Sequence, residues 1–345
     1  MFDNTPKDNN SKSELKYAAD QTFLARCRPK LDLLENLRLE KLAIFKRRKK
    51  LAVPVAAIMT PVLGFIDYML VMWQNSNDDT FAGLTVVALG GLWGWVTSPK
   101  RQYARAYKSD ILPEIAKLIG DFTYDVKGKI PMNELKPSKI IPNHTRYTSE
   151  DYFSGHYKGV GIRFSEIKLT KKKGKSTVTV FNGLAVFLHH GARKFYGHTI
   201  LTKDKSGLTG GDRRKWSGLK RANLVDLEFE RLFDVYTSDQ VEARYLIDPV
   251  IIENIKTLYN EYNGNTLLAA FYEGRVLILI GSKKNHFEPA KIEVPATNKA
   301  ELLALRNEVT QILGIVDRLA LFDPAKVRAA EQQNSASSEP ATRLF

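Results

Sequence analysis

Cysteine is almost absent from this 345-residue sequence, which contains only Cys27. A single thiol cannot form an intramolecular disulfide, and it cannot supply a cysteine cluster for a metal ion. This scarcity also fits a reducing compartment. Internal repeats are absent too, so a solenoid or propeller is not expected. Gly207, Gly210 and Gly211 are not followed by a Gly-Lys-Ser/Thr motif, so a phosphate-binding loop is not expected there either.

Acidic residues are scarce where the basic ones gather. The formal charge is +14, and residues 26–50 hold ten Lys or Arg against three acidic residues, a net charge of +7. This block stands directly before the longest apolar run. A basic block beside an apolar span is typical of the cytoplasmic flank of a membrane segment, whereas a nucleic-acid-binding protein more often spreads its charge over a folded face.

Two apolar runs follow. Leu51–Trp73 has one charged residue, Asp67, and its 23 residues suffice for a helix that crosses a bilayer. Phe81–Thr97 is uncharged but has only 17 residues, near the lower limit. The linker Gln74–Thr80 is acidic and lacks Lys and Arg, while basic residues follow the second run. The positive-inside rule therefore predicts a transmembrane hairpin with both termini in the cytoplasm.

Within the two spans, small residues recur every four positions. This spacing predicts close helix packing or a homo-oligomer, and the residues that carry it are Ala56, Thr60, Gly64, Gly90 and Gly94. Pro54 and Pro61 are expected to kink the first helix. We interpret Asp67 as a carboxylate that reaches the outer headgroups rather than as part of an ion pathway.

The remaining chain predicts an α+β soluble domain with a mainly antiparallel sheet and packed helices. We expect a polar N-terminus and a basic amphipathic helix over residues 1–50, interrupted at Pro29, the hairpin over 51–97, the cytoplasmic domain over 98–325 and a disordered tail over 326–345. Helices are predicted at residues 101–125, 249–262 and 299–321. Strands are predicted at residues 156–168, 176–188, 196–201, 232–236, 241–246, 266–272 and 275–280.

One segment, LEFERLFDVYTSDQVEARYLIDP at Leu227–Pro249, resembles the signature of an uncharacterised bacterial family, the domain of unknown function 3137. Further blocks agree in order: TSEDYFSG (Thr148–Gly155), FSEIKL (Phe164–Leu169), FNGLAVFL (Phe181–Leu188) and HFEP (His286–Pro289). The resemblance covers roughly Tyr103–Pro289. It implies two membrane helices ahead of the domain in the bacterial inner membrane. It implies no known activity or cofactor, and it suggests a LemA-family membrane protein as a partner.

Catalytic and metal sites are weakly indicated. His189, His190 and His198 lie on neighbouring predicted strands near Glu166, but they have no defined metal-ligand spacing, so we predict no metal, no cofactor and no catalytic set. Ser238 and Asp239 near Arg244 form the most marked polar cluster, which we interpret as a cap or ion pair. A ligand or partner site using Glu166, Asp239 and Arg244 is the alternative. An enzyme using Glu166, His189 and Asp239 is a further hypothesis.

Two loops carry concentrated basic charge. Lys171, Lys172, Lys173 and Lys175 surround a turn at Gly174, and residues 203–221, which include Arg213 and Arg214, carry a net charge of +5. Both are interpreted as solvated loops, with contact to anionic lipid as the functional alternative and nucleic acid as the less favoured one. We therefore expect a membrane-anchored binding or scaffold module that recognises a protein partner or the membrane surface.

Overall fold

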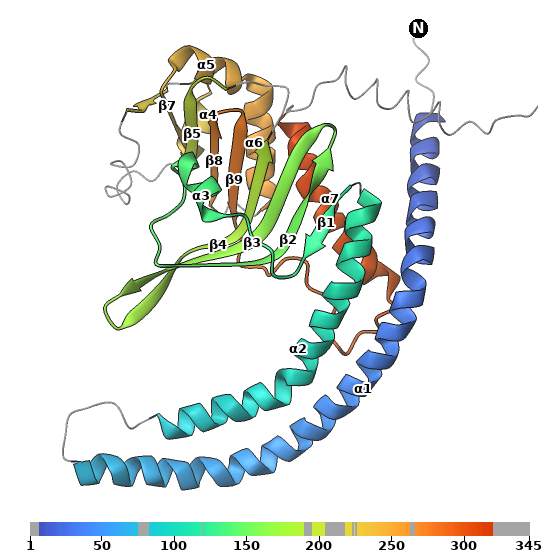
Figure 1. The fold of residues 1–345 in the computed structure, drawn as a ribbon, viewed down its shortest axis with the longest axis vertical. Coiled ribbons are helices and arrows are strands. Elements are labelled where there is room, and N and C mark those ends of the chain that lie inside the picture. The colour runs from blue at the N-terminus through green and yellow to red at the C-terminus, as the bar shows by residue number, and fades with distance from the viewer. Residues whose placement is uncertain are drawn as a thin grey trace, which may run out of the picture. The chain divides into compact units, whose positions relative to one another are not determined.

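The computed structural model describes residues 7–74, 83–119, 121–189, 195–203, 218–222, 224, 226–262 and 266–319. The chain divides into two compact units, drawn in Figure 1. Unit 1 contains residues 1–114 and 288–305, and unit 2 contains residues 115–287 and 306–345. Each unit is described by itself.

Unit 1 is built on two long helices, α1 (Lys7–Gln74) and α2 (Leu84–Ile119), which lie side by side in Figure 1. Covered residues recur on α1 every three or four positions, first at Phe23, Cys27, Leu31, Leu34 and Arg38, then at Ala52, Ala56, Met59, Leu63 and Asp67. On α2 the same spacing gives Val96, Pro99, Tyr103, Tyr107 and Ile111. The mean spacing within each of these three sets is 15/4 = 3.75 residues, close to one helical turn of about 3.6 residues, so the covered residues form one stripe on each helix. These stripes form the seam between the two antiparallel helices.

Polar bonds fix the pairing of the two helices at two levels. Near the loop, the Asp67 carboxylate accepts bonds from the Thr85 backbone N–H and hydroxyl at 3.1 and 2.7 Å. Further along, Arg48 donates to the Trp95 carbonyl and the Ser98 hydroxyl, both at 2.7 Å. Pro99 lacks an N–H, so it leaves the Trp95 carbonyl without its usual helical donor, and Arg48 supplies one instead.

The apolar part of α1 is exposed. Within Asp20–Met72, the most apolar window is only 6% buried, and this is the one helix among the described residues that is long and apolar enough to cross a membrane. A helix in a soluble core would be covered, so the exposure of Val53, Ile58, Val62 and Phe65 argues against that role. Residues 81 and 82 lie outside the described part of the chain, and the second crossing stays a prediction.

A return segment, residues 288–298, packs on the same helices. Glu35 and Arg38 form an ion pair on α1, and they also bind this segment, Glu35 through the Ala296 N–H at 2.7 Å and Arg38 through the Ile292 carbonyl at 2.8 Å. Lys108 pairs with Glu288 at 2.6 Å. These ionic contacts attach the segment to the base of the helix pair.

Unit 2 contains a fully antiparallel sheet with the order β1-β2-β3-β4-β9-β8-β5-β7-β6. This confirms the predicted α+β class. The strands are β1 (Thr123–Asp125), β2 (Arg146–Tyr157), β3 (Val160–Lys173), β4 (Ser176–His189), β5 (His198–Lys203), β6 (Lys220–Arg221), β7 (Phe233–Thr237), β8 (Leu267–Tyr272) and β9 (Arg275–Gly281). The two-residue turn at Glu273–Gly274 joins β8 to β9.

The sheet has two covered faces. On one face the segment with α3 (Met132–Leu135) and the 3₁₀ turn η1 (Lys136–Ser138) covers a core that includes Ile167, Phe187 and Leu277. On the other face Phe153, Phe164 and Phe287 pack together, with Phe153 and Phe164 stacked at 4.6 Å. The helices of this unit are α4 (Leu227–Leu232), α5 (Gln240–Leu246), α6 (Pro249–Glu261) and the 306–318 part of α7 (Lys299–Arg318).

Four expectations about the elements are wrong. The strand predicted at residues 156–168 is interrupted by a turn at residues 158–159, so β2 ends at Tyr157 and β3 begins at Val160. Val241–Leu246 is helix rather than strand, because Asp239 caps the N–H groups of Val241 and Glu242 and starts a helical turn. Helix α2 is continuous from the second apolar run to Ile119, and residues 123–125 form β1. Helix α1 is not interrupted at Pro29, because the long seam with α2 holds the helix through it.

The small residues of the spans are divided between two sides. Ala56 lies on the seam, but Thr60, Gly64 and Gly90 are exposed, and a Cβ added to Gly64 or Gly90 would meet no atom within 4 Å. Gly94 approaches Arg101, which donates to its carbonyl. These glycines therefore do not bring α1 and α2 together, and contact with a second copy of the chain stays a prediction.

Candidate functional site

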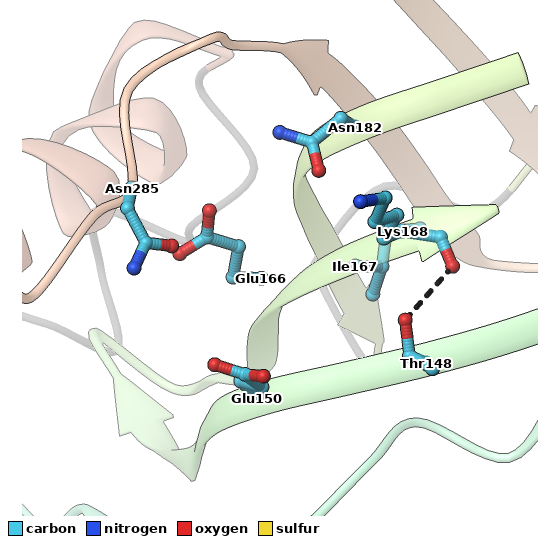
Figure 2. Close-up of a pocket in the computed structure, with 7 residues that line it drawn as sticks. All are labelled: Thr148, Glu150, Glu166, Ile167, Lys168, Asn182 and Asn285. Atoms are coloured by element: carbon cyan, nitrogen blue, oxygen red, sulfur yellow. Dashed lines mark hydrogen bonds between the residues drawn. The ribbon is translucent and has the colours of Figure 1, made fainter. Parts of the chain in front are cut away.

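A polar pocket of about 240 Å³ opens on unit 2 beside strands β2, β3 and β4. Two carboxylates, two amides, a hydroxyl and an amine take part in its lining, shown in Figure 2. The lining residues are Thr148, Glu150, Glu166, Ile167, Lys168, Asn182 and Asn285. The pocket is therefore suited to a polar group rather than to an apolar ligand.

The two carboxylates come together because of strand register. Glu150 on β2 is the direct partner of Glu166 on β3, so both side chains leave the same face of the sheet. The ladder is disrupted just after Glu150, where Asp151 adopts a positive φ of 54° and its carboxylate accepts a bond from the Tyr124 hydroxyl at 2.5 Å. A bulge of this kind ends regular pairing and redirects the neighbouring side chains.

The wall formed by residues 282–287 is held in place by several bonds. Asn182 on β4 bonds the Ser282 backbone in both directions, at 2.8 and 2.9 Å. Glu166 accepts the His286 N–H at 3.1 Å, and Glu308 on α7 accepts the Phe287 N–H at 3.0 Å. Asn285 is thereby positioned so that its side chain points toward Glu166 (Figure 2).

Glycine at position 183 is required by this arrangement. Gly183 has a φ of 147°, and a Cβ there would lie 2.1 Å from the Ile280 carbonyl oxygen. Only glycine allows β4 to approach β9 this closely next to Asn182. The tight approach keeps the Asn182 amide next to the 282–287 wall.

The electrostatics of the pocket favour a positively charged or hydrogen-bond-donating group. Two carboxylates directly opposite each other on an antiparallel pair repel each other. The lining also contains the amine of Lys168, so the pocket has a net charge of −1, which favours a further cationic group. Glu166 is 7% exposed, which strengthens its interaction with any charge that enters. Among the described residues, no group of three or more His, Cys, Asp or Glu side chains is placed to hold a metal ion.

His189 lies on the other face of the sheet from Glu166. It pairs with Gly161 at the end of β4, near Phe187, whose ring also contacts Arg163 at 4.8 Å. Arg163 forms a two-bonded ion pair with Glu134, and that bond lowers the pKa of the Glu134 carboxyl. His198 also lies on this face, stacked on Tyr272. His190 is outside the described residues.

Asp239 and Arg244 lie at α5, away from the pocket lining. Asp239 has the capping role that we inferred from the sequence, with bonds of 2.9 and 3.0 Å to the Val241 and Glu242 N–H groups. Arg244 is an exposed residue of the same helix. Glu166, Asp239 and Arg244 therefore do not form one ligand site, and Glu166, His189 and Asp239 do not converge as a catalytic set.

Several residues of the site were missed by sequence reasoning. Glu150 and Asn285 line the pocket with Glu166, and so do Lys168 and Asn182. Alternation along β2 and β3 would have placed Glu150 opposite Glu166 if the register had been known. No sequence signal marks Asn285, since its position depends on the folded 282–287 wall.

Comparisons with known proteins support the family resemblance. Residues 179–321 match the model of the family described as protein of unknown function (DUF3137). The match confirms the resemblance for this part, while the blocks at Thr148–Gly155 and Phe164–Leu169 lie before it. Comparison with curated proteins finds no match. A crystal structure of the mycobacterial trehalose monomycolate transport factor A, TtfA, aligns with 13% identity over 61% of this chain and 94% of that chain. Its TM-score of 0.31 does not show a common fold.

Proposed function

We propose that this chain is a membrane-anchored binding or scaffold module, whose unit 2 recognises a protein partner on the cytoplasmic side of the bacterial inner membrane. The observation that carries the proposal is the exposed apolar stretch of α1, bonded through Asp67 and Arg48 to the second apolar helix. An exposed surface of this kind is unfavourable in water and favourable in a bilayer.

The orientation follows from charge. Basic residues flank the outer ends of both apolar runs, and the linker between them is acidic, so both termini and unit 2 are assigned to the cytoplasm. Alkaline phosphatase and green fluorescent protein fusions at residue 150 test this assignment. We expect fluorescence and no phosphatase activity, and an active phosphatase fusion would contradict it.

Recognition is assigned to the Glu150–Glu166 pocket. Its carboxylates and amide oxygens accept hydrogen bonds, so it would receive a lysine, arginine or terminal amine of a partner, for which a LemA-family membrane protein is one candidate. The test is affinity purification from detergent-solubilised membranes with quantitative mass spectrometry. Glu150→Lys should lower the recovery of the specific partner at least tenfold.

Glu273→Lys is the matched control, since Glu273 is an exposed glutamate on the same unit at the β8–β9 turn. Equal loss in both variants would mean that bulk charge, rather than the pocket, sets recovery. If only copies of this chain are recovered, and Glu150→Lys does not change their amount, the scaffold proposal is wrong and the chain is a homo-oligomer.

A further inference from the structure

The β3–β4 hairpin extends beyond the rest of the sheet as a two-stranded ribbon (Figure 1). Pairing of β2 with β3 ends at Thr170, and pairing of β9 with β4 ends at Gly183. Beyond those points β3 and β4 pair only with each other, from Lys171↔Val178 to Lys173↔Ser176. The ribbon, residues 171–179, is therefore outside the main core.

The ribbon carries a concentrated positive charge. Lys171, Lys172, Lys173 and Lys175 lie within five positions, and no Asp or Glu occurs between residues 167 and 225 other than Asp204 and Asp212. Lys172, Lys173 and Lys175 are exposed, and so are Ser176 to Thr179. Among the described residues, none of these lysines forms an ion pair, whereas an ion pair with a carboxylate is formed by Lys100, Lys108, Lys158, Lys256 and Lys284.

The clustered lysines of the ribbon do not stabilise the fold. A two-stranded ribbon alone is marginally stable in water, and clustered like charges weaken it further. The turn is still well formed, because Gly174 takes a φ of 59° and the Ser176 hydroxyl donates to the Lys173 carbonyl at 3.0 Å. At its base Thr145 accepts the Lys172 N–H at 3.0 Å. The ribbon is therefore a well-formed hairpin that holds the four lysines close together.

We infer that the ribbon binds anionic lipid headgroups, tip first. Lys172 leaves one face of the ribbon and its neighbours Lys171 and Lys173 leave the other, so a flat approach would use only some of the charges. A tip-first approach brings all four lysines within about 10 Å of the surface, comparable to the Debye length. The inference rests on the proposed membrane anchor, which keeps unit 2 close to a leaflet; each lysine then contributes about fivefold in affinity.

The test uses the full-length chain in lipid nanodiscs. A fluorophore on Thr177→Cys, an exposed position of the ribbon, reports its approach to the lipid. Cys27 is fully buried, and burial raises the pKa of its thiol to about 11, so it does not react. The readout is quenching by a headgroup-labelled lipid. We expect strong quenching in discs of phosphatidylcholine with phosphatidylglycerol, loss of quenching in phosphatidylcholine alone, and loss at high salt.

A matched pair of variants distinguishes the effect of the ribbon lysines from that of the overall positive charge of the chain. Replacing the four ribbon lysines by serine should abolish the quenching, whereas replacing the exposed Lys127, Lys129, Lys136 and Lys283 should not. Equal quenching with and without anionic lipid, or equal loss in both variants, would overturn the inference. Lysine-dependent binding of a single-stranded oligonucleotide that prevents quenching would assign the ribbon to nucleic acid instead. The anchor is tested separately by alkaline extraction of the discs. Loss of the chain under these conditions would show that the proposed membrane anchor is wrong.

Discussion

At the scale of single residues, two histidines of unit 2 couple stability to pH. Burial lowers the pKa of His286, which bonds to Ser282 behind the pocket wall, and of His198, which is stacked on Tyr272. In the unfolded chain the pKa of both histidines returns to about 6.5. The unfolded state therefore binds protons more readily, and acid favours unfolding.

The expected result is a loss of stability as pH falls through about 6.5, with a plateau below the depressed native pKa values. Urea unfolding in a nonionic detergent between pH 7.5 and pH 5 measures it, on a scale of about 1.4 kcal/mol per pKa unit. His286→Gln should flatten part of this dependence, because it removes one titrating group. If His286→Gln leaves the pH dependence unchanged, the assignment to this histidine is contradicted.

The cap at Asp239 gives a second prediction at the same scale. Asp239→Ala should weaken α5 by about 1 kcal/mol, whereas Asp239→Asn should have a much smaller effect, because asparagine also caps well. Hydrogen exchange of the segment 238–246 measures this, with about fivefold faster exchange expected in the alanine variant. Equal exchange in both variants would show that the two bonds from Val241 and Glu242 do not stabilise the helix.

At the scale of elements, the limits of the sequence signal can be assigned to particular contacts. Strands β4, β8 and β9 were predictable because their apolar residues alternate or form buried runs. The segment Val241–Leu246 was mistaken for a strand, since β-branched and aromatic residues outweighed the capping signal of Asp239. Pairing of Glu150 with Glu166 depends on register, and the Asn285 position depends on the fold of a loop, so neither can be read from composition.

The register of the helix pair gives a prediction for α1 and α2. Arg48 supplies a donor to the carbonyl that Pro99 leaves unpaired, and its guanidinium lies 4.7 Å from the Trp95 ring. Arg48→Ala should lower the stability of the pair by about 1 kcal/mol, given that the site is partly exposed. The measurement follows the reaction of the buried Cys27 thiol with a maleimide dye in detergent as the temperature rises. It gives the midpoint temperature at which the helix pair unfolds.

Arg47→Ala is the matched control, because it removes the same charge from the exposed neighbouring position. Its midpoint should stay at the wild-type value. A similar decrease in both variants would indicate that general charge around the basic block, and not the bond to Trp95, sets the stability of the helix pair.

At the scale of the whole molecule, the second apolar helix decides the compartment of unit 2. If both runs cross, unit 2 lies on the same side as the N-terminus. If only the first crosses, unit 2 lies on the opposite side. Asp67 bears on this choice because it caps Thr85 at the start of α2 and thereby holds the two helices together near the linker.

We predict two crossings, which a cysteine-accessibility experiment tests in intact cells. A cysteine replacing Ser76 in the linker should react with a membrane-impermeant maleimide, while a cysteine replacing Ser149 in unit 2 should react only after the membrane is opened. Asp67→Ala should reduce the fraction of molecules with this pattern, because α2 loses its cap and its bond to α1. Reaction of the Ser149 position in intact cells would place unit 2 outside, and it would leave α1 as the single crossing.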